Sequence, residues 1–351
     1  MSLQNVLPLT LGLVLFSFLI TSIFIIPYIN LLYKLHITRQ KEAPKKGKIP
    51  IFDVYHDKKA GTPVGGGVLI ILVVVVLFAL LFPLASHMGV GISTSYDLKS
   101  EVFLIFFTFI SFGLLGLSDD LMKIFSKPRP GLLGQWFGMS RKSKFILQWI
   151  LAGIISYILY KKLGINILHI PFINLNLDLG IFYPIFSSFI IVAFANAYNI
   201  TDGLDGLAVG LLLICLIAFG VISSSSLDTP LSLFIALLIG ALIAFLYFNV
   251  WPARIFLGDA GALSFGATLA VIGLITGSIV ALIVVGGIFI VEIASSLIQM
   301  AGWKYLKKPI LPLAPLHHSF LTWGWEEPKI VFRAWLVGIV LAIFGLWLSV
   351  I

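Results

Sequence analysis

Seven ionisable side chains in four polar stretches of this 351-residue chain have types and spacing that suit chemistry on a charged substrate. They are five aspartates and two histidines, each close to a long apolar segment: Asp119, Asp120, Asp202, Asp205, Asp259, His317 and His318. A charged group beside hydrocarbon is costly unless it meets water, a metal or a partner, so each is a candidate site residue. Carboxylates from several loops are typical ligands of a hard divalent cation such as Mg²⁺, which keeps waters and bridges phosphates. The pattern therefore predicts a cation site that could bind phosphates.

The adjacent pair Asp119 and Asp120 ends an apolar segment in "GLLGLSDDLMK". Neighbouring side chains point in different directions on a helix. We therefore expect only one of the two to bind a metal directly, while the other faces the substrate or holds the ligands in place. Acids at a helix C-terminus oppose the macrodipole, which disfavours the simpler interpretation of a solvated helix end.

The stretch "NAYNITDGLDGL" allows two interpretations. Asp202 could cap a helix that begins near Gly203, with Asp205 in the first turn of that helix. Capping does not explain Asn196 and Asn199, which are three residues apart at the end of the preceding apolar segment. Two amides and two carboxylates around a helix break predict a pocket for a hydrogen-bonding ligand such as a nucleoside.

Further polar groups lie towards the C-terminus. Glu292, Ser295 and Gln299 form one helical stripe, and we expect it to face the protein interior because an unpaired glutamate in lipid is costly. A structural hydrogen bond and a supporting role in catalysis are both open for Glu292. His317 and His318 could be ordinary loop histidines, or they could contact phosphate or transfer a proton.

The composition is that of a membrane protein, because 60% of the residues are hydrophobic, 11% are charged and the mean hydropathy is +1.09. A soluble domain of this size needs a more polar surface. We expect an all-α polytopic membrane protein with a single integral membrane domain over residues 1–351. The stretch 165–183 alternates apolar and polar residues and predicts a short β-hairpin. About ten segments are long enough to span a bilayer: 6–33, 64–85, 102–118, 144–160, 182–199, 206–223, 230–248, 260–276, 278–302 and 331–351.

The basic residues predict the orientation of these spans. Of the 23 lysines and arginines, 20 lie on odd-numbered loops, and the exceptions are Lys99, Lys161 and Lys162. The positive-inside rule therefore puts the odd-numbered loops and the four polar stretches in the cytoplasm, with both termini and the hairpin outside. This orientation explains the net charge of +8 and leaves no support for a nucleic-acid partner. A secondary transporter, the alternative from another functional class, predicts acids near the bilayer midplane.

Five motifs carry a resemblance to a known family. "GTPVGGG", "GLLGLSDDLMK", "NAYNITDGLDGLA", "FLGDAGALSFG" and "APLHHSFLTWGWEEPKIV" occur in the order typical of polyprenyl-phosphate N-acetylhexosamine-1-phosphate transferases. Within these, the chain most resembles the phospho-N-acetylmuramoyl-pentapeptide transferase branch, from about His56 to Arg333.

The resemblance implies an enzyme of the bacterial cytoplasmic membrane with an active-site cleft facing the cytoplasm. UDP-N-acetylmuramoyl-pentapeptide would donate its phosphosugar to undecaprenyl phosphate, with Mg²⁺ as cofactor and with lipid I and UMP as products. The same motifs leave open the sister reaction, which transfers GlcNAc-1-phosphate from UDP-GlcNAc for another cell-surface glycan. A homodimer is also open.

The resemblance also implies roles for individual residues. The positions that match catalytic ones are Asp119, Asp120, Asp259, His317 and His318. Asp259 and Asp202 match metal ligands, and Phe256 is expected to stack on uracil. The positions that match substrate-binding ones are Lys59, Lys123, Lys144, Asn196, Asn199, Asp202, Asp205, Phe256 and Gly258.

Two departures from the family pattern affect these expectations. Ser319 stands where a third consecutive histidine is usual, and Val64 and Gly65 stand in a "TPTMGG" motif that reads "TPVGGG" here. These departures bear on the nucleotide contact at Val64 and on the sugar-side role of Ser319. If Ser319 tunes sugar contact, its replacement by histidine should be tolerated.

Overall fold

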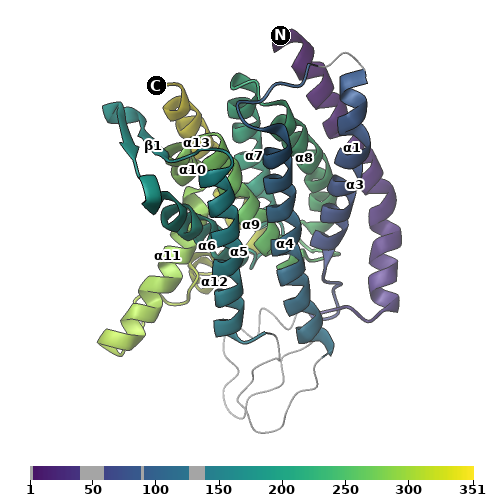
Figure 1. Ribbon diagram of the computed structural model, residues 1–351. Helices are drawn as coiled ribbons and strands as arrows, with labels where there is room; N and C mark the ends of the chain where they lie inside the picture. Colours follow the sequence, from purple (N-terminus) through teal and green to yellow (C-terminus); the bar gives the residue numbers. More distant parts are fainter. Residues whose placement is uncertain (1–2, 40–58, 88–90, 126–138) are drawn as a thin grey trace.

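A computed structural model describes residues 3–39, 59–87, 91–125 and 139–351, which form a bundle of long helices (Figure 1). Within these residues nine helices are long and apolar enough to cross a membrane, or ten if the bent pair α10 and α11 is one span. The expectation of an all-α polytopic protein is confirmed. The long helices are α1 (Leu3–Lys34), α3 (Gly66–His87), α4 (Leu98–Phe125), α5 (Arg141–Lys161), α6 (Tyr183–Thr201), α7 (Leu207–Ser225), α8 (Thr229–Asn249), α9 (Gly258–Ile275) and α13 (Glu327–Val350).

The remaining elements are short. The expected hairpin is confirmed as β1 (Ile167–Ile170) and β2 (Leu175–Asp178), which pair antiparallel with Ile170 opposite Leu175. The other short elements are η1 (Pro171–Ile173), η2 (Gly180–Phe182), α10 (Ile279–Val285), α11 (Gly287–Ala301), η3 (Gly302–Leu306) and α12 (Leu316–Thr322).

The ninth expected span is broken at Gly286, where α10 and α11 meet at 71°. A Cβ on Gly286 would lie 2.6 Å from the ring of Phe194 on α6 and 2.9 Å from the carbonyl oxygen of Leu282. Glycine therefore allows close contact with α6 at the bend. Beyond the bend, α11 points away from the bundle (Figure 1).

Helix α9 lies at the centre of the bundle, where it packs against α4, α6 and α3, and nearly all of its residues are buried. Two glycines bring its first turn close to its neighbours. The Cα of Gly116 on α4 lies against the backbone of Asp259, and Gly67 on α3 lies against Gly261. Side chains larger than hydrogen would separate these helices, so the glycines position the end of α4 beside the start of α9.

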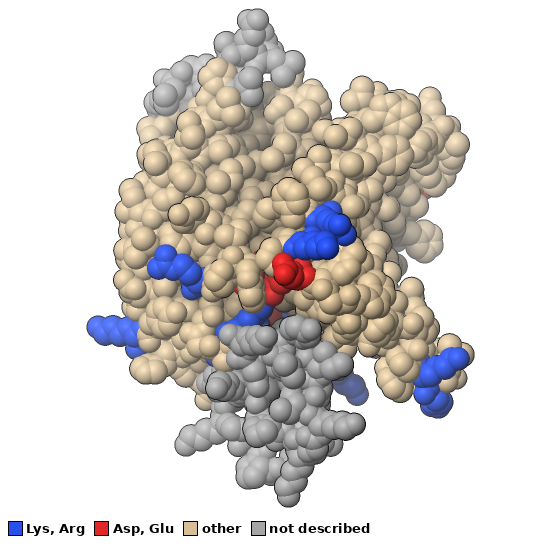
Figure 2. All heavy atoms as spheres, turned by 180° about the vertical axis from the view of Figure 1, so that it is seen from behind, with Lys and Arg blue, Asp and Glu red and all other residues tan. Residues whose placement is uncertain are grey.

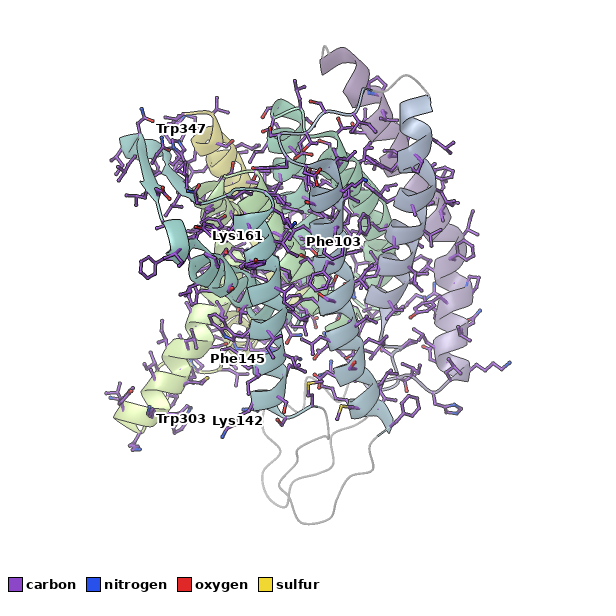
Figure 3. All side chains as sticks on the ribbon, viewed as in Figure 1. Phe103, Lys142, Phe145, Lys161, Trp303 and Trp347 are labelled. Carbon is purple, nitrogen blue, oxygen red and sulfur yellow. The ribbon has the colours of Figure 1, made fainter. Side chains whose placement is uncertain are left out.

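Large apolar side chains cover the outside of the bundle along its length, as expected for a surface in contact with lipid. Phe103, Phe145 and Trp347 are each about half exposed (Figure 3). The two ends of the bundle differ. The two termini and the hairpin lie at one end, and α4 ends and α5 begins at the other (Figure 1). Most basic residues of the first loop, within 40–58, lie outside the described residues.

The expectation that a helix begins near Gly203 is wrong. Helix α6 continues to Thr201, residues 202–206 form a turn, and α7 begins only at Leu207. The N-cap of α7 is Gly206, whose φ of +78° favours glycine, and it makes no side-chain capping hydrogen bond. Asp202 and Asp205 therefore do not cap α7.

Candidate active site

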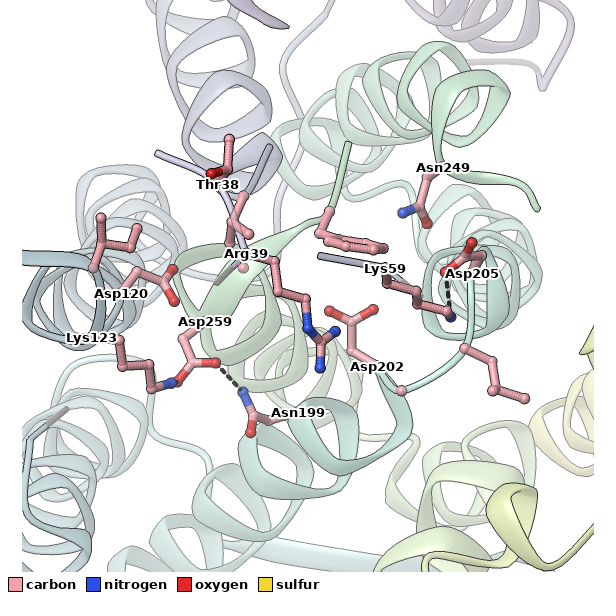
Figure 4. A pocket seen from close by; sticks show the side chains of 16 residues that line it. Thr38, Arg39, Lys59, Asp120, Lys123, Asn199, Asp202, Asp205, Asn249 and Asp259 are labelled. Carbon is pink, nitrogen blue, oxygen red and sulfur yellow. Dashed lines mark hydrogen bonds and ion pairs between the residues drawn. The ribbon is translucent and has the colours of Figure 1, made fainter. Parts of the chain in front are cut away.

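A cavity of about 400 Å³ opens at the end of the bundle where α4, α6 and α8 end and α9 begins (Figure 4). Three of the four polar stretches found in the sequence contribute to it. Its charged and amide lining groups are Arg39, Lys59, Asp120, Lys123, Asn199, Asp202, Asp205, Asn249 and Asp259. On the face opposite to that of Figure 1, acidic side chains lie beside basic ones near the middle, further basic side chains are scattered to both sides, and the surface above is almost free of charged groups (Figure 2).

Asp259, in the first turn of α9, has the densest set of charged contacts. Its carboxylate pairs with Lys123 at 2.7 Å and with Lys144, and Asn199 donates a hydrogen bond to it at 3.2 Å. The helix N-terminus adds a favourable dipole for a negative charge. Both lysines also contact Asp119 at 2.9 Å, so this acid on α4 completes a cluster of two carboxylates and two ammonium groups.

The neighbours Asp119 and Asp120 point in different directions, as predicted. Asp119 is buried behind the lysines and accepts a hydrogen bond from the backbone of Met139 at 2.7 Å. Asp120 lines the cavity and accepts a hydrogen bond from the amide of Ala260 at 3.0 Å, so it caps the start of α9. Gly258 has a φ of +79°, and a Cβ there would lie 2.7 Å from the Asp120 carboxylate. The position therefore requires glycine.

Asp205 joins the turn between α6 and α7 to two other segments. Its carboxylate pairs with Lys59 at 2.6 Å and accepts a hydrogen bond from the amide of Ala253 at 2.9 Å. Lys59 pairs also with Glu327 at 2.5 Å, and that glutamate accepts a hydrogen bond from the Asp205 amide at 2.7 Å. This arrangement fixes Lys59 at the edge of the cavity.

Asp202 lies in the same cavity but has a different environment. Figure 4 shows the guanidinium of Arg39 near its carboxylate. Burial and the negative charge of Asp259 raise the pKa of Asp202 to about 7. A cation bound between these two acids would relieve their repulsion.

The two asparagines near the end of α6 lie in different environments. Asn199 reaches the cavity and Asp259, as the prediction of a polar pocket requires. Asn196 does not line the cavity, because its amide donates to Gln148 on α5 at 2.6 Å and to the carbonyl of Val192 at 2.7 Å. The structure therefore places Asn196 in the contact between α5 and α6.

Phe256 lies in a short extended pairing with residues 63–66. Its amide donates to the carbonyl of Pro63 at 2.8 Å, and its own carbonyl accepts hydrogen bonds from Gly65 and Gly66. The ring lines the cavity together with Val64. Gly65 has a φ of +117°, so glycine suits this departure from the family pattern.

The two histidines lie on α12, behind the turn that follows α6, and do not line the cavity. The Nδ1 of His317 is 3.0 Å from a carboxylate oxygen of Glu292, which leaves Nε2 against Gly203. Within the described residues this buried Nε2 has no hydrogen-bond partner. His318 lies beside it, and its ring centroid is 4.2 Å from that of His317.

Ser319 is wholly buried, and its hydroxyl is hydrogen-bonded to the backbone of Leu313. Ser319 does not line the cavity, and a histidine at this position would need movement of the loop.

The stripe on α11 faces inward, as predicted, and holds the α12 loop. Ser295 accepts a hydrogen bond from the amide of Leu316 at 2.9 Å. Gln299 accepts hydrogen bonds from the amides of Ile310 and Leu311, and it donates to the carbonyl of Leu311. Together with Glu292, these side chains fix the position of the histidines.

Three residues of the site were not singled out from the sequence for a role there: Arg39, Asn249 and Glu327. Arg39 was used only to predict the orientation of the spans. Asn249 is the last residue of an apolar helix. Glu327 lies within the motif "HHSFLTWGWEEPK". The two adjacent glutamates of this motif were the sequence feature that could have marked it as a site residue. Asn249 connects the turn and the loop before α9, because it accepts from Gly206 and donates to Ile255.

The cavity lining fits Mg²⁺ in the chemistry of its donors. Asp120, Asn199, Asp202 and Asp259 all offer oxygen, which suits a hard cation that keeps several waters. Among the described residues, no three acid, histidine or cysteine side chains form a ready metal cage. A site with few protein ligands, completed by water and substrate, is the form that these residues could provide.

Comparisons with known proteins place this geometry in context. Residues 102–277 match the model of glycosyl transferase family 4. The chain is 33% identical over 340 residues to a phospho-N-acetylmuramoyl-pentapeptide-transferase of Geobacillus sp. (strain WCH70), which covers 96% of this chain and 97% of the relative. Relatives of the same name from Staphylococcus epidermidis and Rickettsia canadensis are 37% and 39% identical. The alignments with these two relatives cover 84% and 83% of this chain, and 87% and 80% of the relatives.

Proposed function

Because the chain belongs to the phospho-N-acetylmuramoyl-pentapeptide-transferase family, we propose that the cavity beside Asp259 is its active site. The activity of the family is the transfer of phospho-N-acetylmuramoyl-pentapeptide from UDP to undecaprenyl phosphate, which forms lipid I and UMP in peptidoglycan synthesis. The observation that carries the assignment is the Asp259 cluster, in which two lysines and an asparagine surround one carboxylate at a helix N-terminus.

The charges of the cavity support phosphoryl transfer with a divalent cation. Among the described side chains in and around the cavity, six carboxylates face four basic groups, so the ionised site has a formal charge of −2. Added positive charge would therefore favour the binding of a diphosphate to this site. Asp259 and Asp202 would hold Mg²⁺ there, and the chemistry that the ion would supply is neutralisation of negative charge on phosphate oxygens.

The protein groups then position the two substrates. Phosphoryl transfer needs mainly alignment and charge stabilisation. The acceptor phosphate has a second pKa near 6, so it is largely ionised at neutral pH and needs no strong base. Asp120, which lines the cavity, is better placed than Asp119 to orient that phosphate or take a residual proton. Lys123 and Lys144 would contact phosphate oxygens from the Asp259 side.

The nucleoside end of the donor fits the other part of the cavity. Phe256 offers an aromatic face for uracil. Asn249 and Asp205 offer hydrogen-bonding groups beside it, and Lys59 is fixed there by two carboxylates. Gly258 leaves room at the start of α9.

The orientation proposed from the sequence has support from the bundle. Lys34, Arg39, Lys59, Lys123 and Arg141 lie at helix ends or loops on the cavity side, so that end would face the cytoplasm. Both termini and the hairpin would then lie outside (Figure 1). The cavity lies at helix ends and not midway along the spans, which disfavours the transporter alternative. Association into a homodimer stays a prediction.

The test is release of UMP from UDP-N-acetylmuramoyl-pentapeptide by purified protein with undecaprenyl phosphate. We expect Asp259→Asn to lower the rate at least ~1000-fold, because the variant removes a charge on which the metal and the lysines depend. Asp97→Asn, an exposed acid before α4, is the control and should retain the normal rate. A normal rate for Asp259→Asn would reject the site, and product from UDP-GlcNAc alone would favour the sister reaction.

A further inference from the structure

Arg39 reaches the cavity from the segment that follows α1, and backbone hydrogen bonds fix it there. Its amide donates to the carbonyl of Thr62 at 2.9 Å, and its carbonyl accepts from the amide of Gly61 at 2.8 Å. The next residue of that strand, Pro63, accepts a hydrogen bond from Phe256. Two consecutive extended pairings therefore place Arg39 beside Phe256.

The Arg39 side chain lies over this aromatic ring, with its guanidinium carbon 5.7 Å from the ring centroid. Figure 4 shows it pointing into the cavity between Asn199 and Asp202. Stacking uses the flat face of a guanidinium, while its five N–H groups point outward in the plane. The backbone pairing and the contact with Phe256 thus position the guanidinium inside the cavity.

The other cations of the site are lysines. Lys59, Lys123 and Lys144 each contact two carboxylates at 2.9 Å or less. Much of their positive charge is therefore balanced by the protein, and Arg39 likewise has the Asp202 carboxylate nearby. Arg39 adds a planar donor group that matches phosphate oxygens in pairs, which an ammonium group does not.

We propose that Arg39 binds phosphate oxygens of the UDP-linked donor, beside the aromatic ring that accepts its base. This inference rests on the proposed function and adds a residue to it. In a nucleoside diphosphate only the ribose separates the base from the first phosphate, so a phosphate-binding group belongs close to Phe256. Both substrates carry phosphate, and the experiment must therefore distinguish the donor from the undecaprenyl phosphate acceptor.

The experiment compares Arg39→Ala and Arg39→Lys with a matched control. The control is Arg254→Ala, because the Arg254 guanidinium also lies over an aromatic ring, 5.3 Å from the centroid of Phe248, but is exposed and does not line the cavity. The measurements are KM for donor and for acceptor, and the inhibition constants of UMP and of uridine.

For Arg39→Ala we expect the donor KM and the UMP inhibition constant to rise roughly 10- to 100-fold, the range for loss of a charged hydrogen-bond donor. The inhibition constant of uridine and the acceptor KM should change less than about 2-fold, because neither involves the donor phosphates. Arg39→Lys should recover part of the loss, since it restores charge without the paired donors. Arg254→Ala should match the unsubstituted protein.

Three results would overturn the proposal. UMP inhibition unchanged in Arg39→Ala would remove the phosphate contact. A rise in the acceptor KM alone would assign Arg39 to the other substrate, and equal weakening of uridine and UMP would assign it to the base. Retained uridine inhibition shows that the variant is folded. If the unsubstituted protein released no UMP from the donor, the proposed function itself would fail, whatever the role of Arg39.

Discussion

At the scale of single residues, the site depends on lysines that each bridge two carboxylates. Lys144 contacts Asp119 and Asp259, and Lys59 contacts Asp205 and Glu327. Removing one member of such a buried pair leaves an uncompensated charge, which costs more than the intact pair contributes. The lysines therefore balance the negative charge of the acids as well as offering positive charge to phosphate.

Lys144→Met should lower both the rate and the stability. The side chain of Lys144 is 17% exposed and the Asp119 carboxylate is 3% exposed, so the loss leaves two acids facing each other with Lys123 alone. We expect a fall in rate of roughly 100-fold or more and a loss of about 1–3 kcal/mol in the free energy of unfolding. Lys144→Arg keeps the charge and should keep more of both. Equal activity in Lys144→Met and the unsubstituted protein would contradict this role.

Gly258→Ala tests the close approach of Asp120 to the start of α9. The substitution combines a positive φ with a contact of 2.7 Å between the new Cβ and the carboxylate. Gly164→Ala is the control, because Gly164 also has a positive φ, +70°, but open space around it. Both variants should lose about 1–2 kcal/mol of stability, whereas only Gly258→Ala should lose most of its UMP release. Similar rates in the two variants would show that the contact is unimportant.

At the scale of elements, α11 acts as a support for the loop that carries the histidines. One face of this helix binds α12 and the preceding loop through Glu292, Ser295 and Gln299. His317 in turn lies against Gly203, in the turn that carries Asp202 and Asp205. A change on α11 can therefore reach the cavity through His317 without touching the substrate.

Glu292→Ala should lower kcat while leaving the donor KM within about 3-fold, because Glu292 positions His317 and does not line the cavity. The amide oxygen of Glu292→Gln can still accept hydrogen bonds from His317, so this variant should retain a larger share of kcat. Steady-state rates with thermal unfolding as a control for folding provide the test. A Glu292→Gln variant as inactive as Glu292→Ala would show that the charge, and not the hydrogen bond, matters.

The sequence predicted the elements of the fold better than the contacts between them. Apolar length predicted the spans and alternation predicted the hairpin, because both depend on local composition. The convergence of Asp120, Asn199, Asp202 and Asp259 followed from their positions at span ends. The hydrogen-bond partners of individual side chains were harder to predict, because they depend on packing between segments that are distant in the sequence. Asn196 binds Gln148 on α5, and local sequence gave no sign of that contact.

At the scale of the whole molecule, the bundle separates two chemical environments. The cavity and most of the described basic residues lie at one end, and the hairpin and both termini lie at the other (Figure 1). A lipid-linked acceptor suits this layout, because its tail can remain in the bilayer while its phosphate reaches the cavity.

The proposed orientation can be tested by thiol labelling in intact cells. Cys215 is the single cysteine of the chain and is buried, so the native sequence is a suitable background. We expect a membrane-impermeant thiol reagent to label Phe172→Cys in the hairpin region from outside. Lys307→Cys, in the loop after α11, should be labelled only after the membrane is opened. The reverse pattern would place the cavity outside the cell.

The dependence of UMP release on Mg²⁺ tests the central claim, that Asp259 and Asp202 hold a divalent cation against the donor diphosphate. The rate is measured across Mg²⁺ concentrations for the unsubstituted protein, Asp202→Asn, Asp259→Asn and the control Asp97→Asn. We expect no release in a chelator, a normal curve for Asp97→Asn, a half-saturating Mg²⁺ concentration raised roughly 10-fold or more for Asp202→Asn, and almost no rate for Asp259→Asn. Unchanged Mg²⁺ curves for both cavity variants would contradict the account.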